Sequence, residues 1–132
     1  MSDVAVLGMD AILKKLKVLP ERVQKNVLTG AIRASASSIA KEMKANVPKD
    51  TGTLKKSIGV VKRKTKDKTL VHFTVAPRIK KGGFIAHFIE FGTLKMSAKP
   101  FIRPAYENKG EETIDVAKNY MTKRLDKELA KL

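Results

Sequence analysis

The chain has 132 residues and a net charge of +15, because 28 Lys and Arg stand against 13 Asp and Glu. This length predicts one domain over residues 1–132, which is large enough to bury a core without disulfide bonds or structural metal ions. The absence of Cys excludes disulfide scaffolds, thiol catalysis and Cys-ligated zinc. No apolar run approaches the roughly 20 residues that span a bilayer, and with Asp3 and no basic stretch the N-terminus is not expected to be a secretory signal.

The first third of the chain is predicted to be helical. Asp10 is expected to cap a short helix to about Leu19, which has Ile12, Leu13 and Leu16 on one face. A second helix is predicted from Pro20, which suits a first turn, to about residue 45. Its small residues would let another element approach closely: Gly30, Ala31, Ala34, Ser35 and Ser38. Residues 1–8 are expected to be loosely held.

A strand pair is predicted after a break at residues 46–52. Residues 57–64 are rich in Ile and Val near their start, and residues 69–75 alternate, which places Val71, Phe73 and Val75 on one face. The polar residues 65–68 would form the turn between the strands. Pro77 would end the second strand, because its nitrogen cannot donate to a ladder.

The rest of the chain is predicted to be helical with two mobile loops, at residues 78–83 and 93–99. The short apolar segment 84–91 is expected to be a helix, with a strand as the alternative, and Gly92 would end it. A last helix is predicted from about Pro104, interrupted at residues 108–110, with one apolar stripe. We therefore predict an α+β fold: two N-terminal helices, a small mostly antiparallel β-sheet, and a long C-terminal helix packed on the sheet.

Motifs for catalysis or metal binding are few. Asp50-Thr51-Gly52 spells the aspartic-protease triplet, but its polar surroundings favour a turn with a helix cap over a carboxylate pair between apolar strands. His87 and Glu90 could share a helical face as metal ligands, but no third ligand lies nearby in the sequence. We therefore predict no enzyme, no catalytic residue, no metal and no cofactor, and a small hydrolase or nuclease remains a minor alternative.

Positive charge is concentrated in residues 51–83, which contain ten basic side chains and one acidic one. Such a field attracts polyanions, either nucleic acid or an acidic protein surface, although Lys can also serve merely to keep a hairpin soluble. With 5% aromatic residues and no Trp, contacts to phosphates are favoured over base stacking. The candidate DNA- or partner-facing residues are Lys62, Arg63, Lys64, Lys66, Lys68, Lys80 and Lys81.

Three segments, taken in order, resemble one bacteriophage family. They are residues 47–58 (VPKDTGTLKKSI), residues 88–93 (FIEFGT) and residues 99–105 (KPFIRPA). Their order and spacing resemble the small neck proteins of long-tailed phages, also described as head–tail joining or tail-completion proteins. With the flanking helices the resemblance covers about residues 20–130.

The resemblance implies an assembly role without catalysis. Such proteins are thought to form a homo-oligomeric ring between the head connector and the tail tube, through which DNA passes. The implied location is the virion neck, after a period in the host cytoplasm, with no membrane contact. The residues expected to have structural or interface roles are Pro48, Asp50, Thr51, Gly52, Leu54, Ser57, Glu90, Phe91, Gly92, Thr93, Pro100, Phe101, Arg103 and Pro104.

Each motif has a physical interpretation. The first would form a rigid turn and cap a short helix that delivers Leu54 and Ile58 to the core. Glu90 could accept backbone N–H bonds from the next loop, pair with a cation of a neighbouring subunit, or be an ordinary exposed carboxylate. Phe101 is expected to anchor an extended approach, fixed by two prolines, to the last helix. Arg103 is a candidate partner for Glu90, within or between subunits.

Two interpretations of the basic segment stay open within this family. In a ring it could line the lumen and hold duplex DNA by its phosphates, or it could face an acidic tail or connector surface. A separate alternative is a nonspecific nucleic-acid-binding module, which predicts tight duplex binding that weakens steeply with salt.

Overall fold

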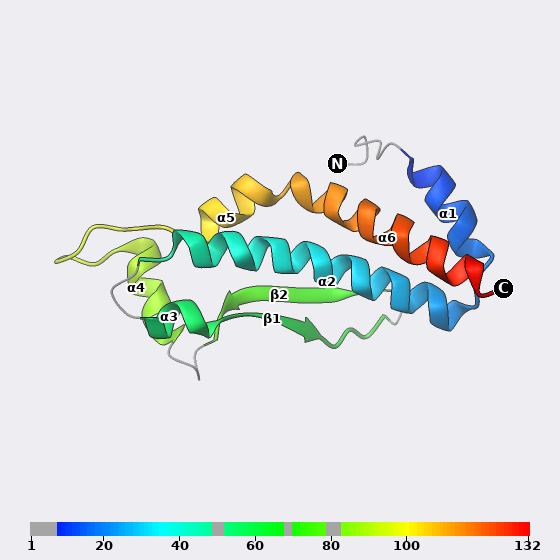
Figure 1. Cartoon of the computed structure of the whole chain (residues 1–132). Helices are drawn as coiled ribbons and strands as arrows, with labels where there is room; N and C mark the ends of the chain where they lie inside the picture. Colours follow the sequence, from blue (N-terminus) through cyan, green and yellow to red (C-terminus); the bar gives the residue numbers. More distant parts are fainter. Residues whose placement is uncertain (1–7, 49–51, 68–69, 79–82) are drawn as a thin grey trace.

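The computed structural model describes residues 8–48, 52–67, 70–78 and 83–132. It has an elongated shape in three layers, with a long central helix, a two-stranded sheet on one side of it and two helices on the other (Figure 1). In chain order the elements are α1 (Met9–Lys17), α2 (Glu21–Asn46), α3 (Gly52–Ser57), β1 (Ile58–Arg63), β2 (His72–Pro77), the 3₁₀ helix η2 (Gly83–Ile85), α4 (Ala86–Phe91), α5 (Ile102–Lys109) and α6 (Glu112–Ala130). The predicted α+β fold class is confirmed.

The central helix α2 contacts both outer layers, and its small residues make this contact close. A Cβ on Gly30 would overlap the hydroxyl of Tyr120 from α6. The Ser35 hydroxyl donates a hydrogen bond of 2.8 Å to the carbonyl oxygen of Thr113. The sequence-based expectation of a close neighbour along this stretch is therefore confirmed, and the neighbour is α6.

The sheet consists of β1 and β2, paired antiparallel from Ile58 opposite Pro77 to Arg63 opposite His72. Val75 is buried, and Phe73 packs against the same core, so the alternation predicted for this strand is confirmed. The strand ends at Pro77 as predicted. Of the predicted turn, Lys68 and Thr69 lie outside the described residues.

Two apolar clusters hold the layers together. One joins the C-terminal half of α2 to α3, both strands, α4 and α5, and the other joins α1, the N-terminal half of α2 and α6. In the second cluster Met121 and Leu125 are buried, as the stripe predicted. The first cluster lies at the end of the molecule that contains all three family-like segments.

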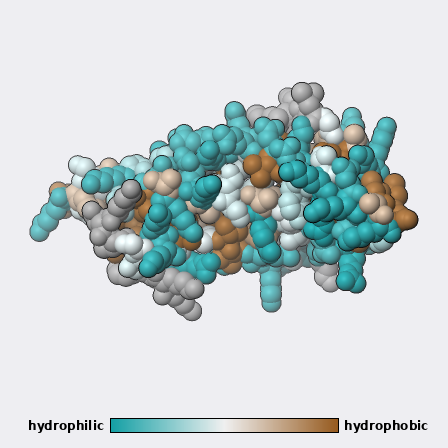
Figure 2. Space-filling view, in the orientation of Figure 1, coloured by the Kyte–Doolittle hydropathy of each residue, from teal (hydrophilic) through white to brown (hydrophobic). Residues whose placement is uncertain are grey.

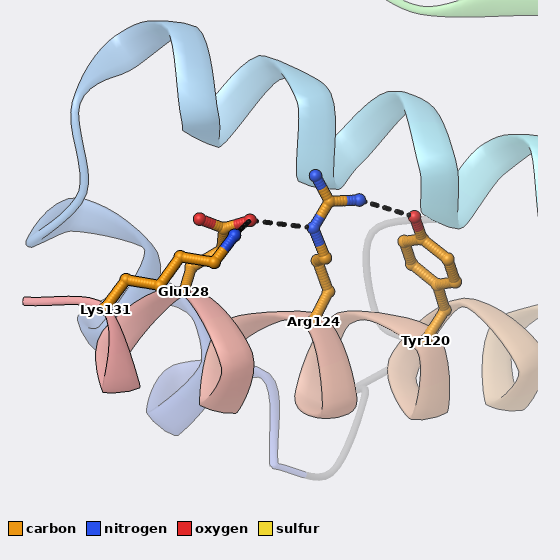
Figure 3. Close-up of polar contacts among 4 residues, drawn as sticks. All are labelled: Tyr120, Arg124, Glu128 and Lys131. Carbon is orange, nitrogen blue, oxygen red and sulfur yellow. Dashed lines mark hydrogen bonds and ion pairs between the residues drawn. The ribbon is translucent and has the colours of Figure 1, made fainter.

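The side of α6 that faces α2 carries a chain of polar contacts (Figure 3). Arg124 donates hydrogen bonds of 3.0 Å to the Tyr120 hydroxyl and to a Glu128 carboxylate oxygen, and Lys131 lies 3.6 Å from the same oxygen. The hydrogen bond from Arg124 lowers the pKa of Glu128. These contacts hold the Tyr120 ring in the position that meets Gly30.

Several sequence-based boundaries were wrong. Asp10 does not cap α1, because the helix starts one residue earlier, after Gly8 at φ 83°. Leu13 is exposed, since α1 packs mainly on α6 and a single neighbour covers only the stripe of Ile12 and Leu16. Ser57 ends α3 and is not part of the strand.

The last helix is two helices, α5 and α6, separated near Gly110 as the predicted interruption indicated. α5 begins at Ile102, so Pro104 lies in its first turn and not at the end of an extended approach. The prediction of one domain stays a prediction. So do the predictions of loosely held segments at the N-terminus and after β2, since residues 1–7 and 79–82 lie outside the described residues.

Candidate interaction surfaces

The carboxylate of Glu90 joins α4 to the start of α5. Its Oε1 accepts hydrogen bonds of 2.9 Å from the backbone N–H groups of Phe101 and Ile102, and its Oε2 accepts one of 3.2 Å from the N–H of Arg103. These N–H groups stand at the N-terminus of α5, where a helix has no internal acceptors for them. The sequence left three interpretations of Glu90 open, and the structure shows the first of them, which is backbone hydrogen bonds to the chain that follows.

Partial burial of this carboxylate would by itself raise its pKa. The three backbone hydrogen bonds and the charge of Arg103 outweigh that effect, so the pKa of Glu90 lies below its ordinary value. Among the described residues the ion pairs do not include one between Glu90 and the Arg103 guanidinium. The predicted pair within a subunit is therefore replaced by a contact to the Arg103 backbone.

We expect Glu90→Gln to lower the free energy of unfolding by about 1–2 kcal/mol at pH 7. The new side-chain amide would place its N–H₂ donor against a backbone N–H donor at the start of α5, so that one hydrogen bond would be lost. A carboxylate whose pKa is lowered on folding stabilises the protein above its unfolded pKa and stops doing so as the pH falls through its folded pKa. The deficit should therefore be constant above about pH 5.5 and shrink below about pH 4.5.

Urea unfolding of both proteins at several pH values measures this deficit. Glu107→Gln is the matched control, because Glu107 is an exposed carboxylate on α5 itself. It should change stability by less than about 0.5 kcal/mol throughout. A Glu90→Gln deficit that is the same at pH 4 and pH 7 would contradict the capping role.

The other motif residues converge on the same end of the molecule. Phe101 is fully buried, and it shares the first apolar cluster with Leu54 and Ile58, as expected for an anchor and for delivery of the short helix to the core. The Ser57 hydroxyl donates to the Leu54 carbonyl oxygen at 2.6 Å. Since Glu90 links the second and third segments, the three family-like segments form one packed unit.

The first segment is described in part. Asp50 and Thr51 lie outside the described residues, so their role as a cap stays a prediction. Pro48 is half-buried, and a Cβ on Gly52 would meet no atom within 4 Å. Gly52 is therefore not required there by close packing.

A tight turn follows α4 and is closed by backbone hydrogen bonds. Gly92 has φ 77°, which favours glycine, and a Cβ there would lie 2.8 Å from the backbone nitrogen of Ala98. The N–H of Thr93 donates to the Met96 carbonyl at 2.8 Å, and the N–H of Met96 donates back at 3.3 Å. The positive φ and the close approach of Ala98 therefore explain why a glycine occupies position 92 in the second family-like segment.

Four large apolar side chains are exposed around this turn. Phe88 and Phe91 lie on α4, and Leu94 and Met96 lie in the loop that follows, with Phe91 68% exposed and Leu94 fully exposed. His87 contacts both Phe rings edge-on or tilted, at 5.9 and 5.1 Å between centroids. Sequence reasoning identified Phe91 but not its three neighbours. The available signal was the absence of Lys and Arg from residues 82–94.

A pocket of about 600 Å³ lies beside these side chains. Its walls come from β2, α4 and the start of α5, and most of the exposed lining is apolar. The lining includes Pro100, Arg103 and Glu90, whose carboxylate is already hydrogen-bonded to α5. An apolar hollow next to exposed apolar side chains is typical of a protein-binding surface.

The basic segment is partly described. Lys62, Arg63, Lys64 and Lys66 are exposed at the distal end of β1 and in the turn after it. Arg63 donates a hydrogen bond of 3.1 Å to the Thr74 hydroxyl. Lys68, Lys80 and Lys81 lie outside the described residues. In Figure 2 hydrophilic residues cover most of the visible face, and hydrophobic patches interrupt them in several places.

Neither a metal centre nor a membrane span is found in the part of the chain that the structure describes. There, no group of three or more His, Asp or Glu side chains is placed to hold a metal ion. No helix there is long and apolar enough to cross a bilayer. His87 and Glu90 both line the pocket, and Glu90 is committed to the α5 backbone.

Comparison with known families decides which kind of protein this is. A family model described as "Bacteriophage HK97-gp10, putative tail-component" matches residues 10–92, more than half of the chain. The chain belongs to this family. The family resemblance to phage assembly proteins is thereby confirmed, and membership in this structural HK97-gp10-like family implies a place in the virion and contacts with other phage proteins. The match runs from α1 to the turn at Gly92 and leaves out α5 and α6. No curated protein and no solved structure matches the chain.

Proposed function

We propose that this protein acts at the head–tail junction of a long-tailed phage, as a subunit of a ring through which the DNA passes. The observation that carries the proposal is the family match over residues 10–92. The finer role is supported by the three neck-like segments, which pack together at one end of the molecule through Leu54, Glu90 and Phe101. In this role the chain has no catalytic task, and its partners are further copies of itself, the head connector and tail proteins.

The charge distribution supports contact with DNA or with an acidic protein. The chain carries +15 overall, and Lys62, Arg63, Lys64 and Lys66 are exposed at the far end of β1 and in the turn after it. Since phosphate contacts need no particular base, such residues suit a channel that must pass every sequence of a genome. The same residues would serve equally to dock on an acidic connector or tail surface.

The proposal is tested by placing a stop codon early in this gene in the phage or prophage that carries it. Electron microscopy of the lysate should reveal DNA-filled heads beside complete, unattached tails. A plasmid-borne copy of the intact gene should restore joined particles, which serves as the control. Normal infectious particles from the stop-codon phage would overturn the proposed role.

The second candidate function is a nonspecific nucleic-acid-binding module, favoured by the net +9 of residues 51–83. It predicts that the isolated protein binds any duplex with a Kd of about 1 μM near physiological salt, with a steep linear fall of log K against log salt. A neck subunit that is monomeric before assembly should bind weakly under the same conditions. Fluorescence anisotropy with a labelled duplex, measured at several salt concentrations, distinguishes the nucleic-acid-binding module from the neck subunit.

A further inference from the structure

Each strand of the sheet has one edge paired with the other strand and one outer edge. The N–H of Arg78 donates to the Ser57 carbonyl at 2.9 Å, and this pair continues the antiparallel register of β1 and β2. Hydrogen-bonded and non-hydrogen-bonded pairs alternate along an antiparallel ladder. Val60 and Lys62 on β1, and Val75 on β2, therefore direct their backbone N–H and C=O groups to the outer edges.

The outer edge of β2 is covered by the chain itself. The Tyr106 hydroxyl of α5 donates a hydrogen bond of 2.8 Å to the outward carbonyl of Val75. Pro77, at the end of the strand, has no N–H to offer on that edge. A further strand on this side would meet the Tyr106 side chain and a position without a donor.

The outer edge of β1 has no such cover. Among the residues that the structure describes, none outside the sheet hydrogen-bonds to the backbone of Val60 or Lys62. Lys62 is exposed and Val60 is half-buried. Figure 1 shows β1 along the lower side of the molecule, away from α5 and α6. An open edge of this kind is a template on which another extended chain can pair.

Charge indicates which kind of chain fits this edge. Residues 52–66 contain six Lys and Arg and no Asp or Glu, and the Arg78 guanidinium lies against Gly59 of the same strand. A second copy would bring the same cations to the edge, and like charges oppose cross-strand pairing. Duplex DNA has the complementary charge, but its phosphates only accept hydrogen bonds and cannot serve the outward carbonyls. An acidic polypeptide strand matches both the charge and the backbone groups.

We propose that an extended, acidic segment of another virion protein pairs with β1 as a third strand of the sheet. The inference rests on the proposed function, which gives the chain protein neighbours at the head–tail junction, and it names the chemistry of one such contact. Backbone hydrogen bonds to Val60 and Lys62 provide affinity, and carboxylates beside Lys62 and Lys64 provide selectivity. The same cations keep the edge from pairing with further copies before assembly.

Two substitutions at one position test the pairing. Lys62→Pro and Lys62→Gln remove the same charge, but only Pro removes the outward N–H. The ladder between β1 and β2 does not use that N–H and should survive both changes. Each purified protein is added to a lysate of the stop-codon phage, in which the wild-type protein should join heads to tails. Lys62→Gln should join particles to within about threefold of wild type. Lys62→Pro should join about tenfold fewer, the effect of losing one or two hydrogen bonds.

A photo-cross-link identifies what covers the edge without using a proline. The chain has no native Cys, so Lys64→Cys, at an exposed position just after β1, takes a single benzophenone maleimide label. After joining in the lysate and illumination, mass spectrometry should find the label attached to an acidic stretch of a different virion protein. Labelled Lys41→Cys, at an exposed position on α2, is the matched control and should not give this cross-link.

The outcomes separate this inference from the proposed function. A wild-type protein that fails to join heads to tails would overturn the neck role and the contact that rests on it. If the wild-type protein joins them and Lys62→Pro does so equally well, or Lys62→Gln loses as much as Lys62→Pro, the strand pairing is wrong and the neck role stands. Urea unfolding checks that Lys62→Pro is folded, and the cross-link decides if it is not. Cross-links from Lys64→Cys only to DNA or to a further copy of this chain would also overturn the pairing.

Discussion

Phe101→Ala is expected to lower the free energy of unfolding by about 3–5 kcal/mol. Phe101 has no exposed surface and belongs to the cluster that joins α2, α3, the sheet, α4 and α5. Removing its ring leaves a cavity where these elements meet, and a domain of this size has a total stability of only about 5–15 kcal/mol. The variant should therefore lose a large fraction of its stability and unfold at a clearly lower urea concentration.

Urea unfolding followed by circular dichroism measures the loss. Phe91→Ala is the matched control, since Phe91 is 68% exposed and should contribute less than about 0.5 kcal/mol. If both variants lost the same stability, Phe101 would not be the anchor of this end. A loss confined to Phe101→Ala also predicts that joined particles disappear with it, because the three family-like segments would no longer be held together.

Reversing four exposed basic residues is expected to have the largest effect on function. The residues are Lys62, Arg63, Lys64 and Lys66, each changed to Glu. If they contact phosphates, the slope of log K against log salt for duplex binding should fall by about 3 to 4, close to 0.9 for each contact. Plaque formation by the variant phage should be lost.

Micrographs of the variant particles tell the two uses of these residues apart. A lumen-lining role predicts joined particles that leak or fail to deliver DNA, whereas a docking role predicts heads and tails that never join. The matched control reverses four exposed Lys elsewhere, which are Lys14, Lys25, Lys41 and Lys123, and so makes the same change in net charge. Wild-type plaque formation by the first variant would exclude both roles.

Much of the fold could be predicted because local patterns dictate it. The small residues of α2 indicated a close neighbour, and the alternation around Phe73 and Val75 indicated a half-buried strand. Leu13 shows the limit of such reasoning, because its spacing fits the buried face of α1 while its exposure depends on which elements pack there. The periodicity of apolar residues indicates which face of a helix is apolar, but it does not indicate which elements pack against that face.

The candidate surfaces were predictable to different degrees. The three family-like segments identified Glu90 and Phe101, but only the structure places the Glu90 carboxylate on the start of α5, since that contact spans eleven residues of chain. The apolar group around Leu94 was missed for two reasons. Phe88 belongs to an apolar segment, which ordinarily predicts burial, and Leu94 and Met96 lie in the stretch that was expected to be a mobile loop. Its exposure arises because no described element covers that side of α4.

The position of the protein in the particle is the most direct test of the proposed role. The C-terminal residue, Leu132, is exposed, so a short epitope tag there should be reachable. Gold-labelled antibody against the tag, viewed on purified infectious particles, should mark the junction between head and tail. Label along the tail tube or at its distal tip would contradict a neck role while leaving membership in a tail-component family intact.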